Sequence, residues 1–248
     1  MAQTAADDWQ FRGMIYGYLP TIGGSTAFPA GVGSDVSVDA KKILNNLKFT
    51  FMGSLEAQKG SWGAFTDILY LNVGGSKSGN RDLTIGGADL PAGITANASL
   101  DIKGTVWTLG GNYRVVATPE ASFDVFAGAR LLSVNEKLGW EFSGNVGPIV
   151  GPGQTGNSSA KLDNWDGIVG AKGRWNFGAN REWFVPYYLD VGTGDSKRTW
   201  QAVAGVGCGF SWGEVIAAWR YLGYDFKPGQ KIEELNFNGP VIGVAFRW

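Results

Sequence analysis

The sequence predicts an all-β fold, a transmembrane antiparallel up-and-down β-barrel of ten strands, on the basis of three observations. The composition of the 248 residues combines 39 Gly, 11 Trp, 14 Phe and 8 Tyr with only 17% charged residues, whereas soluble domains carry about 25% charged residues. Much of the chain alternates between apolar and polar residues with a period of two, which is typical of a strand with two different faces. Tight turns also alternate with long connections, as they do in outer-membrane barrels.

The apolar content suits a barrel better than a bundle of membrane helices. The apolar fraction is 44%, and the sequence contains no run of 18 apolar residues that could cross a bilayer as a helix. A barrel strand needs apolar side chains only at alternate positions, where it faces lipid. We therefore expect a single barrel domain, residues 1–248, in the bacterial outer membrane, surrounded by lipid bilayer and lipopolysaccharide. Met1–Ala6 has neither a basic nor an apolar region, so we expect a secretory signal peptide to have been removed.

Ten segments show the alternation at a length close to the roughly 9–11 residues that a tilted transmembrane strand requires. In chain order they are 9–19, 48–60, 63–74, 104–116, 121–134, 163–177, 182–193, 198–211, 213–225 and 240–248. In 63–74 the register stays open, because apolar residues share a face with an acid and a slip of one residue would exchange the two faces. These residues are Phe65, Leu69, Leu71 and Asp67.

The middle and C-terminal segments have one apolar, aromatic face each. Residues on these faces include Trp107, Leu109, Tyr113, Phe123, Val125, Leu131, Trp165, Val169, Trp175, Trp200, Val206, Phe210, Val215 and Trp219. The last segment alternates most clearly, with Pro240, Ile242, Val244, Phe246 and Trp248 opposite Val241, Gly243, Ala245 and Arg247. We expect the aromatic faces to contact lipid and the opposite faces to line the lumen.

The connections predict the orientation of the barrel. Tight turns are expected near Gly60–Ser61, Thr118–Glu120, Gly178–Arg181 and Ser211–Gly213, and long connections at 20–47, 75–103, 138–162 and 227–236, with a shorter one at 194–197. Ten strands place both termini and all four tight turns on the periplasmic side, and make 20–47, 75–103 and 138–162 long extracellular loops. Eight or twelve strands remain possible, since Asp35–Asp39 could form another short strand.

The first long loop contains a short helical pattern. Asp39–Leu47 would place Ile43, Leu44 and Leu47 on one side of a helix. One interpretation is a loop that packs on the rim of the barrel, and the other is a plug that folds into its mouth. Together with Phe28 and Pro29, Ile43 and Leu44 could also line an apolar pocket near the outer rim, which transfer of apolar molecules through the wall would need.

The run ILNNLKFTFMGSLEAQKGSWGAFTDILYLNV (43–73) resembles a widespread family of proteobacterial outer-membrane barrel proteins, small and porin-like or opacity-type. The matching residues are Met52, Gly53, Glu56, Ala57, Lys59, Gly60, Trp62, Gly63, Asp67, Tyr70 and Leu71. Later matches are FAGAR (126–130), WDGIVGAKGRW (165–175), TWQAVAGVGCGFSW (199–212), WRYLGYDF (219–226) and GPVIGVAFRW (239–248). The resemblance implies a small outer-membrane barrel and little about activity. The first outer loop departs from the family by lacking its usual acidic pattern.

The end of the sequence is similar to a known assembly signal. Ile242, Val244, Phe246 and Trp248 look like the C-terminal pattern that the outer-membrane assembly machinery reads. They also fit an ordinary lipid-facing edge of the last strand. The two interpretations are compatible, because the last strand must pair with the first to close the barrel and remove its edges.

Charged residues on the faces opposite the aromatic ones are the candidate site. A Lys or Arg that faces lipid near the bilayer midplane costs about 2–4 kcal/mol, so these residues are expected to point into the lumen. They are Glu56, Asp67, Arg114, Asp124, Arg130, Lys172, Arg174, Asp190, Arg220 and Arg247, with Asp166 as a further member. One interpretation is a network of salt bridges that holds the barrel shut, because an unpaired buried charge is strongly destabilising. The other is a constricted polar channel, and the excess of Arg favours anionic solutes.

The composition also indicates which kinds of binding and catalytic sites are not expected. A net charge of −1 lacks the basic surplus of nucleic-acid binding proteins. Cys208 is the only cysteine and there is no His, so the sequence predicts no disulfide, no metal site, no cofactor and no catalytic residue. Outer-membrane proteases of the omptin type and lipid A deacylases rely on a His. We therefore expect a monomeric, non-enzymatic barrel: a porin-like passive channel for small polar or anionic solutes, or a closed barrel that acts through its extracellular loops.

Overall fold

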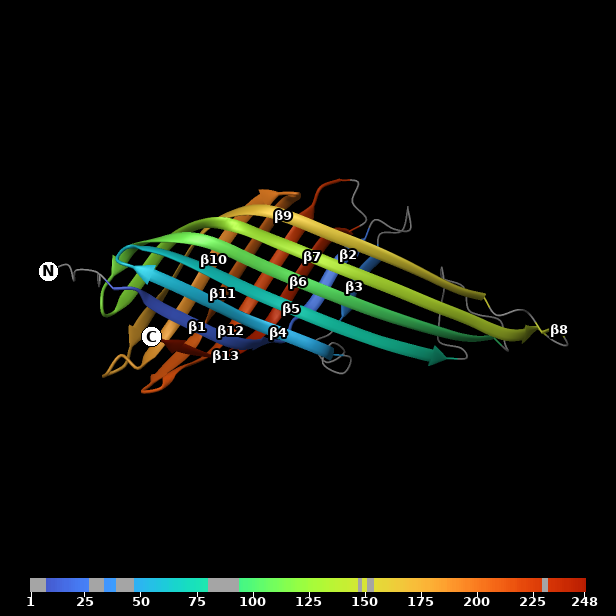
Figure 1. Ribbon diagram of the computed structural model, residues 1–248, viewed down its shortest axis with the longest axis horizontal. Coiled ribbons are helices and arrows are strands. Elements are labelled where there is room, and N and C mark those ends of the chain that lie inside the picture. The colour runs from blue at the N-terminus through green and yellow to red at the C-terminus, as the bar shows by residue number, and fades with distance from the viewer. Residues whose placement is uncertain are drawn as a thin grey trace.

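The computed structural model describes residues 8–26, 34–38, 47–79, 94–146, 149–150, 154–228 and 232–248. Ten antiparallel strands form a closed ring, in which the last strand pairs with the first, and the predicted fold class is confirmed (Figure 1). The ring strands are β1 (Gln10–Tyr18), β4 (Leu47–Lys59), β5 (Trp62–Gly79), β6 (Ile94–Ala117), β7 (Ala121–Val146), β9 (Gln154–Phe177), β10 (Trp183–Gly194), β11 (Ser196–Phe210), β12 (Gly213–Phe226) and β13 (Ile232–Arg247). No helix among the described residues is long and apolar enough to cross a membrane.

Three short strands lie outside this ring. β2 (Thr21–Thr26) follows β1 and continues its pairing along β13, and β3 (Ser34–Val38) forms a hairpin with β2. β8 (Ile149–Val150) pairs with the end of β7. The short strand that the sequence allows near Asp35–Asp39 is therefore present, but it pairs only with β2 and leaves the ring at ten strands.

The start of β1 and the end of β13 lie together at one end of the barrel, called the turn end below (Figure 1). The connections between β4 and β5, β6 and β7, β9 and β10, and β11 and β12 are tight turns at this end, where the sequence predicts them. Gly60 and Gly178 have φ of 57° and 92° in two of these turns, a left-handed conformation that glycine adopts without a steric penalty. The opposite end is called the loop end.

The strands of the ring differ greatly in length. β6, β7 and β9 have 24, 26 and 24 residues, whereas β1 has 9 and β10 has 12. A transmembrane strand requires about 9–11 residues, so β6, β7 and β9 run well past the shorter strands at the loop end (Figure 1). Much of the segments 75–103 and 138–162, which the sequence predicts as loops, is therefore strand. The sequence predicted the end of each strand where the apolar alternation ends. Strands that extend into water can remain hydrogen-bonded to their neighbours without an apolar face, so their outer parts give no such signal.

The outer surface of the ring is apolar and ends in an aromatic band at the turn end. Trp9, Phe11 and Trp248 form one stack, with ring centroids 6.1 and 6.0 Å apart. Phe210 and Trp212 stack at 5.6 Å on the neighbouring part of the wall. Such aromatic girdles mark the membrane interface in barrels of this kind, so the turn end of the ring lies at one surface of the bilayer.

β5 resolves the register that the sequence left open. Phe65, Leu69 and Leu71 are buried, and they share the inner face with Asp67. Apolar side chains therefore occur inside the ring as well as on its lipid face. The lumen consequently contains layers of different polarity.

Candidate functional site

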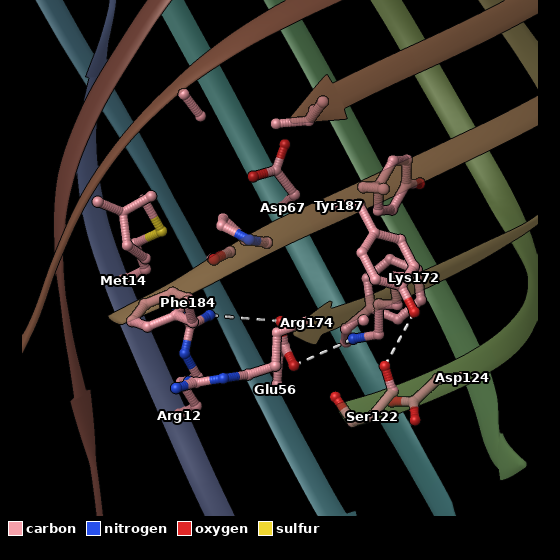
Figure 2. Close-up of a pocket in the computed structure, with 18 of the residues that line it drawn as sticks. Arg12, Met14, Glu56, Asp67, Ser122, Asp124, Lys172, Arg174, Phe184 and Tyr187 are labelled. Carbon is pink, nitrogen blue, oxygen red and sulfur yellow. Dashed lines mark hydrogen bonds and ion pairs between the residues drawn. The ribbon is translucent and has the colours of Figure 1, made fainter. Parts of the chain in front are cut away.

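The candidate site is the lumen, where inward-pointing side chains from all ten strands meet. At the turn end the lumen contains a cavity of about 750 Å³, called the vestibule below (Figure 2). Its wall includes five cationic side chains, namely Arg12, Arg114, Lys172, Arg174 and Arg247. The inner end of the vestibule reaches Asp67 and Arg220 near mid-barrel.

Glu214 organises one side of the vestibule. Its carboxylate accepts hydrogen bonds from Arg12 Nη2 at 3.2 Å and Arg174 Nη1 at 2.6 Å, and forms an ion pair with Arg247 Nη2 at 2.7 Å. The three arginines come from β1, β9 and β13, so this cluster joins strands from opposite sides of the ring. Three guanidinium groups thus share one carboxylate.

The other acids of the vestibule also have basic partners. Asp124 accepts from Arg114 Nε at 2.8 Å and Nη2 at 3.1 Å, the bidentate geometry that gives strong pairing. Glu56 lies 3.1 Å from Lys172 Nζ and 3.6 Å from Arg12 Nη1. These contacts fix the cations along the wall.

Aromatic rings hold two of the cations in place. The guanidinium of Arg174 lies over the ring of Phe184 at 3.8 Å from its centroid, and Lys172 Nζ lies over Phe65 at 4.3 Å. Both cations sit within the distance at which a ring face attracts positive charge. Phe65 and Phe184 are themselves buried, so they form a firm backing for the cationic side chains.

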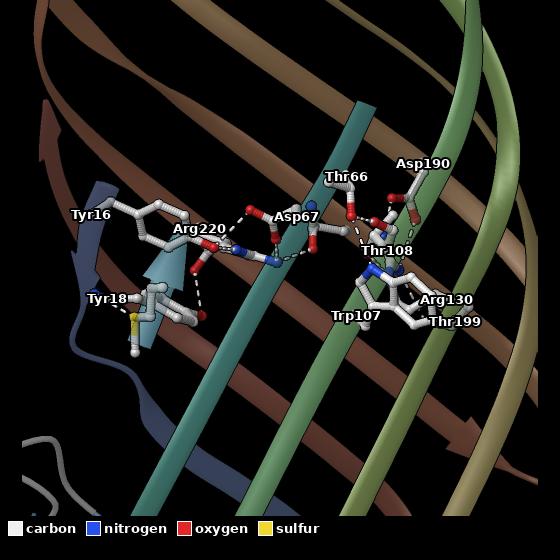
Figure 3. A network of polar contacts seen from close by, with 12 residues as sticks. Tyr16, Tyr18, Thr66, Asp67, Trp107, Thr108, Arg130, Asp190, Thr199 and Arg220 are labelled. Carbon is white, nitrogen blue, oxygen red and sulfur yellow. Dashed lines mark hydrogen bonds and ion pairs between the residues drawn. The ribbon is translucent and has the colours of Figure 1, made fainter. Parts of the chain in front are cut away.

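Beyond the vestibule lies a polar middle layer that crosses the lumen (Figure 3). Arg130 donates from Nη1 to Asp190 Oδ1 at 3.0 Å and from Nη2 to Asp190 Oδ2, and both side chains are 0% exposed. Arg130 also donates to the hydroxyls of Thr108 and Thr199. Breaking a buried pair of this kind from one side is expensive, because the remaining charge has no compensation.

A second network in the middle layer surrounds Arg220 (Figure 3). Its guanidinium donates to Asp67 Oδ1 at 3.0 Å, to the Tyr16 hydroxyl at 2.9 Å and to Gln201 Oε1 at 2.9 Å. Tyr16 in turn donates to Asp67 Oδ2 at 2.7 Å. Residues from β1, β5, β11 and β12 are therefore tied together across the interior.

Asp166 forms a third, smaller group. It accepts hydrogen bonds from Asn164 Nδ2 at 2.7 Å and from the backbone N–H of Ser196 at 2.9 Å. Asn164 also donates to the Ser196 hydroxyl at 2.9 Å. All three residues are buried, so this group anchors the start of β11 to β9.

An apolar layer fills the lumen on the loop-end side of the middle layer. It consists of Tyr18, Met52, Leu69, Leu71, Val106, Leu132, Leu222, Tyr224, Phe226, Phe237 and Val241, and the ring of Tyr16 from the middle layer packs against it. Leu132 and Leu222 are 0% exposed. Because these residues come from seven strands around the ring and exclude solvent, the lumen is packed at this level.

The solved structures to which this chain is similar include proteins of the bacterial outer membrane. The outer membrane protease OmpT from Escherichia coli is similar with a TM-score of 0.57 and 10% identity, over 100% of this chain and 99% of that one. The translocator domain of the autotransporter NalP from Neisseria meningitidis has a TM-score of 0.41 and 16% identity, over 99% and 89% of the two chains. Ail of Yersinia pestis has a TM-score of 0.33 and 11% identity, over 98% and 99%.

The likeness to OmpT shows a bacterial outer-membrane type of fold and no more, since the identity is low. No protein-family model matches the chain. No curated protein matches it either. The chemistry of the site therefore has to be argued from its own residues.

All ten charged residues that the sequence predicts for the lumen contribute to the vestibule or the middle layer. The structure brings Arg130 together with Asp190, and Arg220 with Asp67. In the C-terminal pattern Ile242, Phe246 and Trp248 are exposed on the outer face and Val244 is partly exposed. Ile43 and Leu44, and the side chain of Leu47, lie outside the described residues, as do Phe28 and Pro29.

The candidate site predicted from the sequence did not include Arg12 and Glu214. Of the apolar layer, the sequence placed Val241 on a lumen face and left Leu69 and Leu71 open. Glu214 lies on the same face of its strand as Arg220, and Arg12 lies on the face opposite the aromatic residues Trp9 and Phe11. The period-two alternation could therefore have assigned both side chains to the lumen. The rest of the apolar layer gives no such signal, because an inward Leu and a lipid-facing Leu look the same in a sequence.

The arrangement supports electrostatic binding. Among the described residues, no group of three or more His, Cys, Asp or Glu side chains could hold a metal ion. Each acid of the vestibule lies within ion-pair distance of at least one cation. The vestibule therefore presents fixed charges and hydrogen-bond donors.

Proposed function

We propose that this protein is a small porin-like barrel of the bacterial outer membrane, closed at rest, that acts through the sheet projecting from its loop end. The observation that carries the closed state is the Arg130–Asp190 pair, which is 0% exposed and lies beside the packed apolar layer. A water-filled channel would leave charged lumen residues in contact with solvent. In this proposal the turn end faces the periplasm and the loop end faces outward.

The projecting sheet supports a role at the cell surface. β6 pairs with β7 as far as Ile94 opposite Gly144, and β7 pairs with β9 as far as Phe142 opposite Gln154. A barrel that only crossed the membrane would need strands of about half this length. The sequence of the projecting segments ITANASLD (94–101) and QTGNSSA (154–160) is rich in Ser, Thr, Asn and Gln, a composition that suits a polar partner outside the cell.

The second candidate, slow passive entry of small polar or anionic solutes, is favoured by the vestibule. It supplies a wide cationic entrance at one end of the lumen. A solute would then have to cross the middle layer and the apolar layer, so conduction requires both to rearrange.

We propose that the barrel works as a monomer in lipid and lipopolysaccharide, after insertion by the outer-membrane assembly machinery.

Single-channel recording on refolded protein in planar bilayers tests the closed state. The wild-type protein is expected to give no steady current, because buried Leu132 and Leu222 block the lumen. The Leu132→Ala/Leu222→Ala variant removes volume from that layer and should give small current steps. A steady wild-type current would contradict the proposal and favour the passive channel.

A trimmed variant tests the surface role. Asn135 pairs with Lys161 in the β7–β9 ladder and Asn72 pairs with Lys103 in the β5–β6 ladder at the same level, so joining each pair through an Asn-Gly turn removes both projecting hairpins and preserves the register below them. Barrel formation is checked by the heat-dependent shift of the folded band in gel electrophoresis. Cells that display the trimmed protein should adhere less to one another and to coated surfaces than wild-type cells. Equal adherence would argue against the surface role.

A further inference from the structure

The walls of the vestibule carry an uncompensated positive charge. Five cationic side chains of the wall (Arg12, Arg114, Lys172, Arg174 and Arg247) form ion pairs with three acids (Glu56, Asp124 and Glu214), which leaves a surplus of two positive charges. The Arg220–Asp67 pair at the inner end adds none. The charged side chains of the adjoining turns, Lys59, Glu120, Arg181 and Glu182, also sum to zero.

The surplus is concentrated around Glu214. Among the described residues, Glu214 is the only carboxylate within ion-pair distance of either Arg174 or Arg247. Arg12 also bonds to it and lies close to one further acid, Glu56. Arg12 and Arg174 are mostly buried, with side chains 21% exposed, so mutual repulsion is screened less here than on an open surface. A further anion at this place would relieve that repulsion.

The shape of the vestibule suits a small ligand. Its volume of about 750 Å³ lies within the roughly 300–1,000 Å³ of typical small-molecule sites. The polar middle layer and the apolar layer close its inner end, so a molecule that enters from the turn end is held there. Guanidinium groups match carboxylate and phosphate oxygens through paired N–H donors.

We propose that the vestibule is a binding site for a small anion with two or more anionic oxygens, a polycarboxylate or a phosphate, which enters from the turn end and is held by Arg12, Arg174 and Arg247. Such a site goes beyond the proposed surface role and does not depend on it. It also does not require conduction, because the ligand leaves by the way it entered.

Isothermal titration of the full-length protein in detergent micelles tests the site. Citrate and inorganic phosphate are titrated in separate experiments, with sodium chloride used to keep the ionic strength constant, since salt screens surface charges. Saturable binding of either probe by the wild-type protein is expected. Citrate alone would identify a polycarboxylate site and phosphate alone a phosphate site, and absence of saturable binding for both would overturn the proposal.

Variants locate the binding. Arg174→Gln and Arg247→Gln each remove one charge-assisted donor, which is worth about 1.5–3 kcal/mol, so affinity should fall about ten- to hundredfold. Arg181→Gln is the matched control, because Arg181 is an exposed arginine of the same end that pairs with Glu120 outside the vestibule. Affinity that falls equally in the control, or in none of the three variants, would overturn the site.

The Glu214→Gln variant is expected to change the affinity for the anion in the opposite direction. It raises the surplus in the vestibule from two positive charges to three and frees donors of three arginines, so a folded variant should bind the probe more tightly than wild type. Weaker binding would mean that Glu214 itself, rather than the surplus of arginines, makes the site. Because Arg247 is 53% exposed near the end of the last strand, the Arg247→Gln variant is expected to fold even where Glu214→Gln does not.

Discussion

The turn-end half and the loop-end half of the lumen are built by the same strands but have opposite character. Along β12, Glu214 and Arg220 face the turn-end half, and Leu222 and Tyr224 face the loop-end half. The first half contains a cationic cavity and the second is packed and apolar. The difference teaches that charge in a barrel lumen does not by itself make a channel, because apolar residues farther along seven of the strands pack the lumen.

The largest effect is expected where the two halves meet. Arg130→Met leaves Asp190 buried without its partner, so unfolding free energy should fall by about 3–5 kcal/mol. Urea unfolding followed by tryptophan fluorescence measures this. The Arg130→Met/Asp190→Leu variant removes both charges and should recover much of the loss. If the single variant is as stable as the double one, the pair contributes little.

A somewhat smaller effect is expected inside the apolar layer. Leu222 is 0% exposed, and Leu222→Ala should destabilise the barrel by about 2–5 kcal/mol through lost burial and the resulting cavity. The same unfolding experiment measures it. Leu109→Ala, on the exposed outer face, is the control for removing a leucine from a strand. Equal losses for the two variants would mean that the lumen at Leu222 is not packed.

The hydroxyl group of Tyr16 offers a test of the hydrogen bonds in the middle layer. Tyr16→Phe removes the hydroxyl that donates to Asp67 and accepts from Arg220. The free energy of unfolding should fall by about 1–3 kcal/mol, because Asp67 and Arg220 each lose a hydrogen bond. The ring remains and packing is unchanged. A variant as stable as wild type would show that the Asp67–Arg220 pair needs no support from β1.

The smallest effect on stability is expected in the vestibule. Arg247 is half exposed and shares Glu214 with two other arginines, so Arg247→Gln should change unfolding free energy by less than about 1 kcal/mol. Its effect on anion affinity should be much larger than this. A loss comparable to that of Arg130→Met would mean that the vestibule arginines are structural.

The ring of strands could be predicted from the sequence because lipid imposes a strict alternation on the outer face. Arg114, Asp124, Arg130 and Lys172 could be assigned to the lumen for the same reason. Their pairings could not, because partners such as Arg12 and Glu214 come from strands far apart in the chain and meet only when the ring closes. The length of β6, β7 and β9 was also missed, since strands in water keep pairing without an apolar signal.

The pairing of the first strand with the last has a consequence for how the molecule enters the membrane. Arg12 lies opposite Arg247 and Tyr18 opposite Val241, and contacts between the two ends of a chain are the slowest to form. Until they form, β1 and β13 each carry a row of unpaired N–H and C=O groups, which the hydrocarbon core does not tolerate. Closure of the ring and its burial in the hydrocarbon core are therefore coupled, because only the closed ring leaves no strand edge exposed to lipid.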